Sequence, residues 1–569
     1  MSGAAEAAGP LRESGLEVAE RTRTAWGHRP PDLLLRGARV LLPTGELAQR
    51  DVGIVGRRIA VVDEDLVAPG EATLDLSGKT IVPGYVEPHC HTLGPLSAGN
   101  YCGRALARGT SCVLSDDSFV YGFLEPEQYP PMLDVSARLP LVLRWSLRLE
   151  GPRTVPLAAV AELIERPDVA QVGEVMVRPV LEDLPAEVAE VIAAARSAGL
   201  RVEGHGPGAS PRTLGVAAAA GITSEHESMR AEQLLERLRK GIWAPIRYTD
   251  LLRDAPAILA EAIERGISLE RTSFTTDWSL PPWIERHGLI DGVIEAALGA
   301  GLPAAEAYAC ASRRPASYLS LDAHLGFVAP GRLASLNVLD DLERPLPSRV
   351  FSLGDQVARD GELTIEVPDV DWEGLRAPRW SQRDRGPVAA TFQPHPDDPA
   401  LSLEGAAITK LGAGRGGEPI VCLALDPDRD TFTRGAIHGM PAELEGIAST
   451  LTPRRLMVAV GADPAALSRC VDAVMECGGG IAFQQDGELR RLPLPVGGVI
   501  TAAPFAEVVG FWDAAQALFE GLGHPYPDPL STLLYIASDS LPGARFNASG
   551  LVETKTKTLV APARAVTWA

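Results

Sequence analysis

The chain of 569 residues has few lysines, few aromatic residues and no long apolar segment. Only five of its 53 basic residues are lysine, namely Lys79, Lys240, Lys410, Lys555 and Lys557. No apolar run approaches the ~20 residues that a membrane-spanning helix requires, which argues against an integral membrane protein. The seven cysteines show no C-x-x-C spacing. They favour a protein of a reducing compartment over a disulfide-rich secreted one.

The charge balance excludes further classes of partner. The 74 acidic residues outnumber the 53 basic ones and give a net charge of −21. DNA and anionic membranes would repel such a surface. Residues 1–29 are rich in Ala, Glu and Arg and lack the apolar segment of a secretory signal. We therefore expect a cytoplasmic enzyme that acts on a small molecule, without a nucleic-acid or membrane partner. Its expected association state is a homo-oligomer, with a dimer favoured.

Hydrophobic periodicity divides the chain into blocks. Residues 32–83 and 326–366 alternate apolar and polar residues between turns, as strands do. Residues 84–325 alternate short apolar strands with Ala- and Leu-rich helices, and their length suits a (β/α)₈ barrel of ~250 residues. The expected α/β architecture is an N-terminal extension (1–31), a small β-sandwich domain built from both flanks (32–83 and 326–366), a catalytic barrel (84–325), a linker (367–390) and an appended C-terminal α/β domain (391–569).

Histidines follow the predicted barrel strands in a suggestive order. His89 and His91 form H-x-H, and residues i and i+2 of a strand point to the same face. His205, His226 and Asp277 each come at the end of a later apolar run, where barrel enzymes carry their catalytic residues. Imidazole and carboxylate ligands suit a first-row divalent ion. The ordered set predicts a metal site, whereas H-x-H alone would favour a structural pair.

This pattern resembles the amidohydrolase superfamily, and the flanking segments "GKTIVPGYVEPHCH" and "GFVAPGRLASLNVLDD" agree with it. Many two-metal members bridge their ions with a carbamylated lysine on the fourth strand. No lysine occurs between Lys79 and Lys240, so that bridge cannot form in this window. Glu174, in "VGEVMV", stands at the corresponding strand end, and a carboxylate can bridge two cations directly. The alternative for Glu174 is a surface or salt-bridged carboxylate.

Within the superfamily, the chain from about 32 to 560 resembles the metal-dependent adenine deaminases. The resemblance rests on "GEVM", "GHGPG", "SEHES", "TTDW" and "RLRKGIWAPIR" in the barrel. The segment "GGGIAFQQDGELRRLPLPVGGV" is similar to the C-terminal domain of that family. The resemblance implies two divalent ions, manganese or iron with zinc as a further option. The implied ligands are His89, His91, Glu174, His205, His226 and Asp277.

The implied reaction is hydrolytic deamination of adenine to hypoxanthine and ammonia, in which a metal-activated water attacks C6 of the purine. Asp277 would accept the proton of the water and pass it to the leaving nitrogen, as general base and then general acid. Glu227 is the second candidate catalytic residue, as a support of the ligands or a contact to the substrate. A carboxylate placed at a helix N-terminus is the alternative for Glu227.

Three segments depart from the adenine deaminase pattern and leave the substrate open. They are Leu93–Pro95 after H-x-H, Asp117–Phe119 after the next strand, and Thr452–Leu456 in the C-terminal domain. Arg454 and Arg455 in the last segment could meet an anionic substrate or be solvated surface. Changed hydrogen-bonding groups can alter substrate preference by up to ~10⁴–10⁵. The substrate is therefore adenine or a related amino-heterocycle; an amidase or cyclic amide hydrolase with the same two metals, and a non-enzymatic binding protein, are the alternatives.

Overall fold

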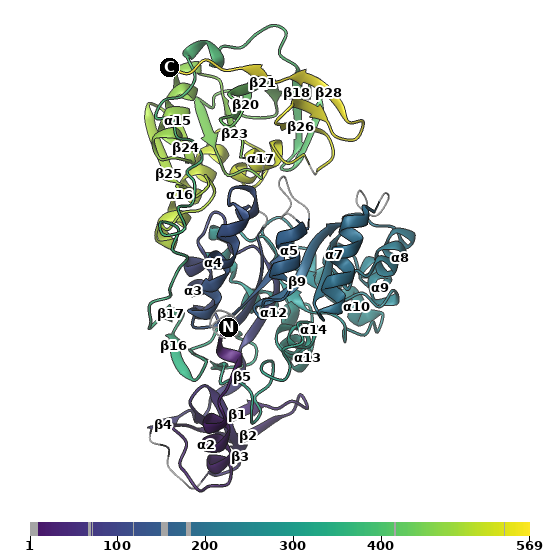
Figure 1. Ribbon diagram of the computed structural model, residues 1–569, viewed down its shortest axis with the longest axis vertical. Coiled ribbons are helices and arrows are strands. Elements are labelled where there is room, and N and C mark those ends of the chain that lie inside the picture. Colours follow the sequence, from purple (N-terminus) through teal and green to yellow (C-terminus); the bar gives the residue numbers. More distant parts are fainter. Residues whose placement is uncertain are drawn as a thin grey trace.

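The computed structural model describes residues 9–569 except 67–69, 71, 118, 150–156, 178–183, 415, 416, 454 and 540. Figure 1 shows three blocks along the long axis, with a small β domain at one end, an α/β barrel in the middle and a C-terminal domain at the other end. No helix in the described parts of the chain is both long and apolar enough to span a bilayer.

Eight short parallel strands form the barrel. The first six pair in chain order within one sheet, and the last two pair with each other. Bridges between Ser224 and Trp243, and between Cys90 and Asp277, connect the two groups and close the ring. The predicted (β/α)₈ barrel is thus present. Its strands are β6 (Tyr85–Cys90), β7 (Thr110–Asp116), β8 (Val142–Leu147), β9 (Val169–Met176), β10 (Arg201–His205), β11 (Ser224–Glu225), β12 (Ile246–Arg247) and β13 (Phe274–Thr275).

A helix follows each strand, and local signals in the sequence define the helix ends. Ser97 and Ser210 cap two of the helices by accepting hydrogen bonds from backbone N–H groups. Gly221 ends one of these helices with a φ of 101°, a conformation that favours glycine. The helices are α3 (Ala98–Ala107), α4 (Tyr129–Leu133), α5 (Leu157–Leu163), α7 (Ala186–Ser197), α8 (Pro211–Ala220), α9 (Ala231–Arg239), α10 (Ala255–Glu264), α11 (Pro281–His287), α12 (Ile290–Gly299), α13 (Ala304–Ala311) and α14 (Arg313–Tyr318).

The two flanks of the barrel pair in one nine-stranded sheet. Antiparallel pairing of β5 with β14 joins the N-terminal strands to those that follow the barrel. Helix α2 (Gly15–Ala25), capped by Ser14 and Glu17, packs against β3. The sandwich form of this domain stays a prediction. The strands are β1 (Leu33–Leu41), β2 (Leu47–Val55), β3 (Arg58–Asp63), β4 (Ala72–Asp75), β5 (Thr80–Pro83), β14 (Leu336–Leu339), β15 (Arg349–Ser352), β16 (Asp355–Arg359) and β17 (Glu362–Leu363).

The C-terminal domain contains a second nine-stranded sheet and a separate three-stranded sheet. Its elements are β18 (Ala400–Gly405), β19 (Ile408–Leu411), β20 (Ile420–Asp426), β21 (Thr431–His438), β22 (Gly446–Ser449), β23 (Met457–Gly461), α15 (Pro464–Glu476), β24 (Gly480–Gln485), β25 (Glu488–Pro493), α16 (Phe505–Gly521), α17 (Pro529–Ile536), β26 (Ala544–Asn547), β27 (Gly550–Glu553), β28 (Thr558–Pro562) and β29 (Arg564–Ala565).

The C-terminal domain contacts loops at the mouth of the barrel. The Thr501 amide donates to the carbonyl of Pro95 (2.9 Å), and Asn100 Nδ2 donates to the carbonyl of Ala503 (2.9 Å). Trp380, within the segment predicted to be a linker, is 1% exposed and packs in the core of the C-terminal domain with Phe392. Residues 367–390 thus contribute to the packing of that domain as well as connecting it to the barrel.

Candidate metal centre

The six predicted metal ligands all lie at the carboxyl ends of barrel strands. His89 lies on β6 and His91 directly follows it, while Glu174 lies near the end of β9. His205 ends β10, His226 follows β11, and Asp277 comes two residues after β13. In a parallel barrel these ends meet at one mouth. The structure therefore brings together all six side chains that the sequence singled out.

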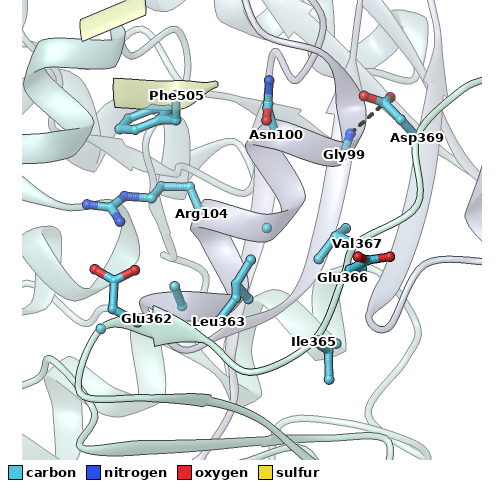
Figure 2. A pocket seen from close by; sticks show the side chains of 13 residues that line it. Gly99, Asn100, Arg104, Glu362, Leu363, Ile365, Glu366, Val367, Asp369 and Phe505 are labelled. Carbon is cyan, nitrogen blue, oxygen red and sulfur yellow. Dashed lines mark hydrogen bonds between the residues drawn. The ribbon is translucent and has the colours of Figure 1, made fainter. Parts of the chain in front are cut away.

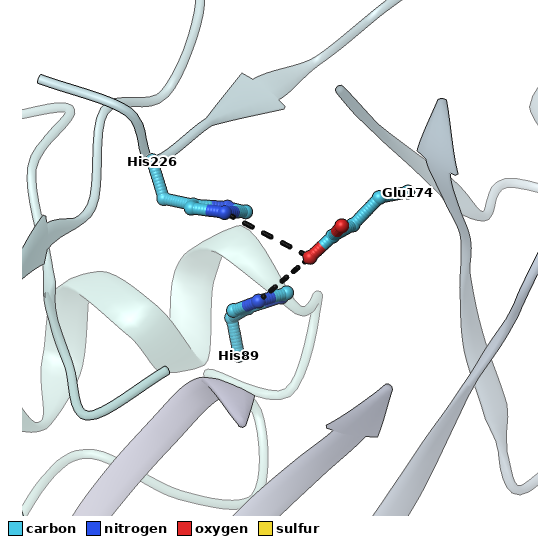
Figure 3. Close-up of side chains that lie close together, drawn as sticks. All are labelled: His89, Glu174 and His226. Atoms are coloured by element: carbon cyan, nitrogen blue, oxygen red, sulfur yellow. Dashed lines mark ion pairs between the residues drawn. The ribbon is translucent and has the colours of Figure 1, made fainter. Parts of the chain in front are cut away.

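The donor atoms of these residues converge on a small region, and Figure 3 shows three of the side chains, His89, Glu174 and His226. Glu174 Oε1 lies 3.2 Å from His89 Nε2 and 3.8 Å from His226 Nε2. Asp277 Oδ1 lies 3.4 Å from His89 Nε2 and 3.2 Å from His91 Nε2. His205 presents Nδ1, 3.5 Å from Glu174 Oε2 and 3.4 Å from His226 Nε2. Two overlapping groups result, one around His89, His91 and Asp277 and the other around His205 and His226.

Groups behind the ligands fix the imidazole tautomers. Glu203 accepts from His89 Nδ1 at 2.9 Å and from His226 Nδ1 at 3.0 Å. Burial alone would raise the pKa of Glu203, but the charges and hydrogen bonds of these histidines lower it to about 2. Because an ionised carboxylate can only accept, both Nδ1 atoms carry a proton, which leaves Nε2 as the nitrogen of each ring that can bind a metal ion. His91 Nδ1 likewise donates to the backbone carbonyl of Asp116.

The residues fit a bound divalent ion. His89 is fully buried, and its Nε2 atom has no hydrogen-bond partner even though carboxylate oxygens lie nearby. A buried polar atom without a partner is costly, and a metal ion satisfies such a lone pair. Four imidazoles and two carboxylates form a mixed N/O donor set that suits manganese, iron or zinc. The chemistry of the set therefore agrees with the predicted kind of cofactor.

Glu203→Gln is expected to weaken metal binding by ~10–100-fold, because outer groups that orient histidine ligands have effects of that size. A glutamine can accept from one of the two Nδ1–H groups but presents its own N–H₂ to the other. Equilibrium dialysis against Mn²⁺ measures the change, with Glu187→Gln on the exposed face of α7 as the matched control. An unchanged affinity in Glu203→Gln would contradict this role.

Two arginines contact the carboxylates of the centre. Arg247 forms a bidentate pair with Glu227 and also donates to Asp277 Oδ2 at 3.0 Å. Glu227 Oε1 in turn lies 3.4 Å from His205 Nδ1 and 3.6 Å from His226 Nε2. Arg148 Nη1 lies 2.9 Å from Glu174 Oε2. Glu227 thus lies beside the candidate ligands, which is one of the two positions predicted for it.

Glu203, Arg247 and Arg148 were not predicted as site residues. For Glu203 a usable signal exists, because it stands two residues before His205 on the same strand and must share its face. The same spacing relates Glu87 to His89. Burial raises the pKa of Glu87 to about 7, although hydrogen bonds from Thr276 and from the His89 amide act in the opposite direction. For the arginines, position at a strand end is the only available signal.

Two of the departing segments lie close to the centre. The backbone amide of Leu93 donates to Asp117 Oδ1 at 2.8 Å, and burial raises the pKa of Asp117 to about 6. The ring of Phe119 lies 5.3 Å from that of Trp278, which lies 5.8 Å from the ring of His91. Leu93, Phe119 and Trp278 therefore form an apolar surface next to His91, which we call the aromatic wall. Ser118 lies outside the described residues.

The third departing segment is held within the C-terminal domain. Thr452 Oγ1 donates to the carbonyl of Leu456 at 2.7 Å. Arg455 Nε lies 3.2 Å from Asp428 Oδ2, and its Nη2 donates to the carbonyl of Trp380 at 3.2 Å. These contacts give Arg455 a structural role. Arg454 lies outside the described residues.

A cleft of about 540 Å³ lies elsewhere, along α3 (Figure 2). Arg104 crosses it with its guanidinium 5.1 Å from the ring of Phe505, and the amide of Gly99 donates to Asp369 at 3.1 Å. Among the described residues that line this cleft, none is a predicted metal ligand. The cleft is therefore separate from the candidate centre.

Comparison with known proteins agrees with this geometry. Residues 139–362 match the amidohydrolase family, and residues 419–558 match the adenine deaminase C-terminal domain. The chain therefore contains an amidohydrolase domain followed by an adenine deaminase C-terminal domain. The match to the amidohydrolase family includes Glu174, His205, His226 and Asp277. The predicted family resemblance and the predicted class, a hydrolase acting on C–N bonds, are confirmed.

Relatives of the chain align with it over nearly their whole length. An adenine deaminase from Dehalococcoides mccartyi is 28% identical, over 95% of this chain and 99% of that protein. A Bacillus subtilis protein, provisionally named an adenine deaminase, is 28% identical over 94% of this chain and 95% of its own. The solved structure of a β-aspartyl dipeptidase from Fervidobacterium islandicum AW-1 aligns with a TM-score of 0.47 and 20% identity, over 58% of this chain and 98% of that chain.

Proposed function

We propose that the protein is a metal-dependent deaminase that hydrolyses adenine, or a closely related amino-heterocycle, to the oxo-heterocycle and ammonia. One observation carries this proposal. A barrel whose mouth gathers four histidines and two carboxylates is joined to a domain that matches the adenine deaminase C-terminal domain. Relatives aligned over almost all of the chain are named adenine deaminases, which supports the same substrate.

The proposed metal ligands are His89, His91, Glu174, His205, His226 and Asp277. The proposal includes two ions, manganese or iron, with Glu174 as the shared ligand. When bound, such ions supply a water that is acidic enough to be a nucleophile near neutral pH. A cytoplasmic location, a homodimer and the predicted domain boundaries, except that of the 367–390 linker, are further parts of the proposal.

Asp277 is the proposed proton carrier. Its Oδ1 faces the first histidines, while its Oδ2 accepts from Arg247. It can take a proton from the attacking water and release it to the amino nitrogen of the substrate. Glu227, held by both nitrogens of the Arg247 fork, is proposed to contact the substrate or to fix the ligands next to it. Because the guanidinium group of Arg247 is planar and rigid, it limits the rotation of the carboxylates of Glu227 and Asp277.

The aromatic wall supports a planar substrate. Trp278 is half-buried beside His91, Phe119 is half-buried beside Trp278, and a purine ring can stack on such side chains. Leu93 is fully buried nearby and offers no hydrogen bond from its side chain. Recognition of the ring edge must then come from backbone groups and from the charged residues at the mouth.

Manganese-loaded protein is expected to release one ammonia for each adenine consumed, because the proposed chemistry exchanges one amino group for one oxygen. Ammonia and purine are measured in the same samples, with metal-stripped protein as the control that should show only background. Metal-loaded protein that leaves adenine intact would contradict adenine as the substrate. Turnover of cyclic amides by that sample would favour the alternative amide hydrolase.

A further inference from the structure

Arg148 places a positive charge on one oxygen of the proposed bridging ligand. It directly follows β8, the strand next to the one that carries Glu174. Its Nη1 atom lies 2.9 Å from Glu174 Oε2 and 2.8 Å from Asp116 Oδ1. The side chains of Arg148 and Glu174 are 16% and 5% exposed, so water screens this contact only weakly.

Asp116 holds the guanidinium in that position. Asp116 is fully buried, and its Oδ2 accepts from Ser146 Oγ at 2.9 Å. Its backbone carbonyl accepts from His91 Nδ1. Arg148 is thus fixed between two buried carboxylates at the mouth of the barrel.

The two oxygens of Glu174 face different parts of the centre. Oε1 lies near His89 and His226, whereas Oε2 lies 3.5 Å from His205 Nδ1 and beside Arg148. Glu227 Oε1 lies 3.4 Å from His205 Nδ1 and 3.6 Å from His226 Nε2, slightly nearer than the oxygens of Glu174, and it is bonded to Arg247. By contrast, the carboxylate oxygen that faces His91 is Asp277 Oδ1, while Arg247 bonds to the other oxygen of Asp277.

This asymmetry affects any pair of bound cations. Near His205 and His226, two of the carboxylate oxygens that a cation could use, Glu174 Oε2 and Glu227 Oε1, are each bonded to a guanidinium group, whose charge repels the cation. A cation at the His89, His91 and Asp277 position faces Glu174 Oε1 and Asp277 Oδ1. In both carboxylates the arginine contacts the other oxygen. The first position should therefore bind more weakly than the second.

We infer that Arg148 is a positioning residue that makes the two metal positions unequal, with the ion at His205 and His226 bound more weakly than the ion at His89, His91 and Asp277. The inference rests on the proposed function, because it needs the proposed metal centre. It gives Arg148 a role in metal occupancy that is distinct from substrate contact.

The test measures Mn²⁺ binding to the full-length protein and to Arg148→Met by equilibrium dialysis, with electron paramagnetic resonance to distinguish single from coupled ions. In the wild type, the second ion should bind at least ~10-fold more weakly than the first. Arg148→Met should tighten the second ion by ~10-fold or more and change the first by less than ~3-fold, a range typical of groups that support metal ligands. Arg148→Lys, which keeps the charge, should resemble the wild type.

Arg148→Met also leaves Asp116 without its cation, so Arg148→Met/Asp116→Asn is measured beside it and should give the same tightening. Two equal ions in the wild type, or no tightening in either methionine variant, would overturn the inference and leave the proposed function standing. If both ions bind more weakly in these variants by the same factor, Arg148 has only a structural role, and the inference is overturned as well. Absence of stoichiometric Mn²⁺ in the wild type would refute the metal centre itself, and with it both proposals.

Discussion

Asp277→Asn is expected to lower kcat by roughly 10³-fold or more, because loss of a general acid–base group typically costs 10²–10⁴-fold and this residue also faces the metal ligands. Asparagine has nearly the same shape but cannot accept the proton of the attacking water. Asp277 Oδ1 lies within 3.4 Å of Nε2 of both His89 and His91. The substitution therefore removes a proton carrier and alters a metal ligand together.

The measurement must separate these two effects. Ammonia release is recorded at saturating substrate, and the metal content of the same sample is determined after loading with excess Mn²⁺. Asp355→Asn, at an exposed position of β16, is the matched control and should retain wild-type kcat. If Asp277→Asn holds its full metal content and still turns over at the wild-type rate, Asp277 is not the proton carrier.

The clustering of the six candidate ligands could be predicted from the sequence because it depends on local order. Each ligand follows an apolar strand, and parallel strands bring their carboxyl ends to one mouth whatever the details of packing. His89 and His91 share a face through strand alternation. The lysine-free interval before Lys240 excluded the carbamylated bridge and left Glu174 as the residue in its place.

The remaining contacts depend on which strands become neighbours in space. Arg148 reaches Glu174 only because β8 pairs with β9 in the register that the fold selects. Arg247 reaches Asp277 because β12 pairs with β13. Trp380 looked like part of a linker because its neighbours are rich in Pro and Arg, yet it fills the core of the C-terminal domain. Such contacts depend on tertiary packing, and the residue pattern of a single sequence does not predict that packing.

A buried ion pair beneath the metal centre should have the largest effect on stability. Arg237 on α9 is 1% exposed, and Glu225 at the end of β11 is fully buried. Arg237 Nε donates to Glu225 Oε2, and Glu225 Oε1 accepts from the amide of Gly206 at 2.9 Å. Glu225 and Gly206 directly adjoin His226 and His205. The pair therefore connects the strand ends that carry two of the predicted ligands.

Arg237→Met is expected to lower the free energy of unfolding by about 3–5 kcal/mol, because it leaves the Glu225 charge buried without a cation. Arg237→Met/Glu225→Gln removes that charge and should recover part of the loss. Denaturant unfolding followed by circular dichroism measures both variants. Arg239→Met, on the same helix with its side chain 54% exposed, should leave stability close to wild type. If Arg237→Met and Arg239→Met unfold at the same denaturant concentration, the buried pair does not stabilise the barrel.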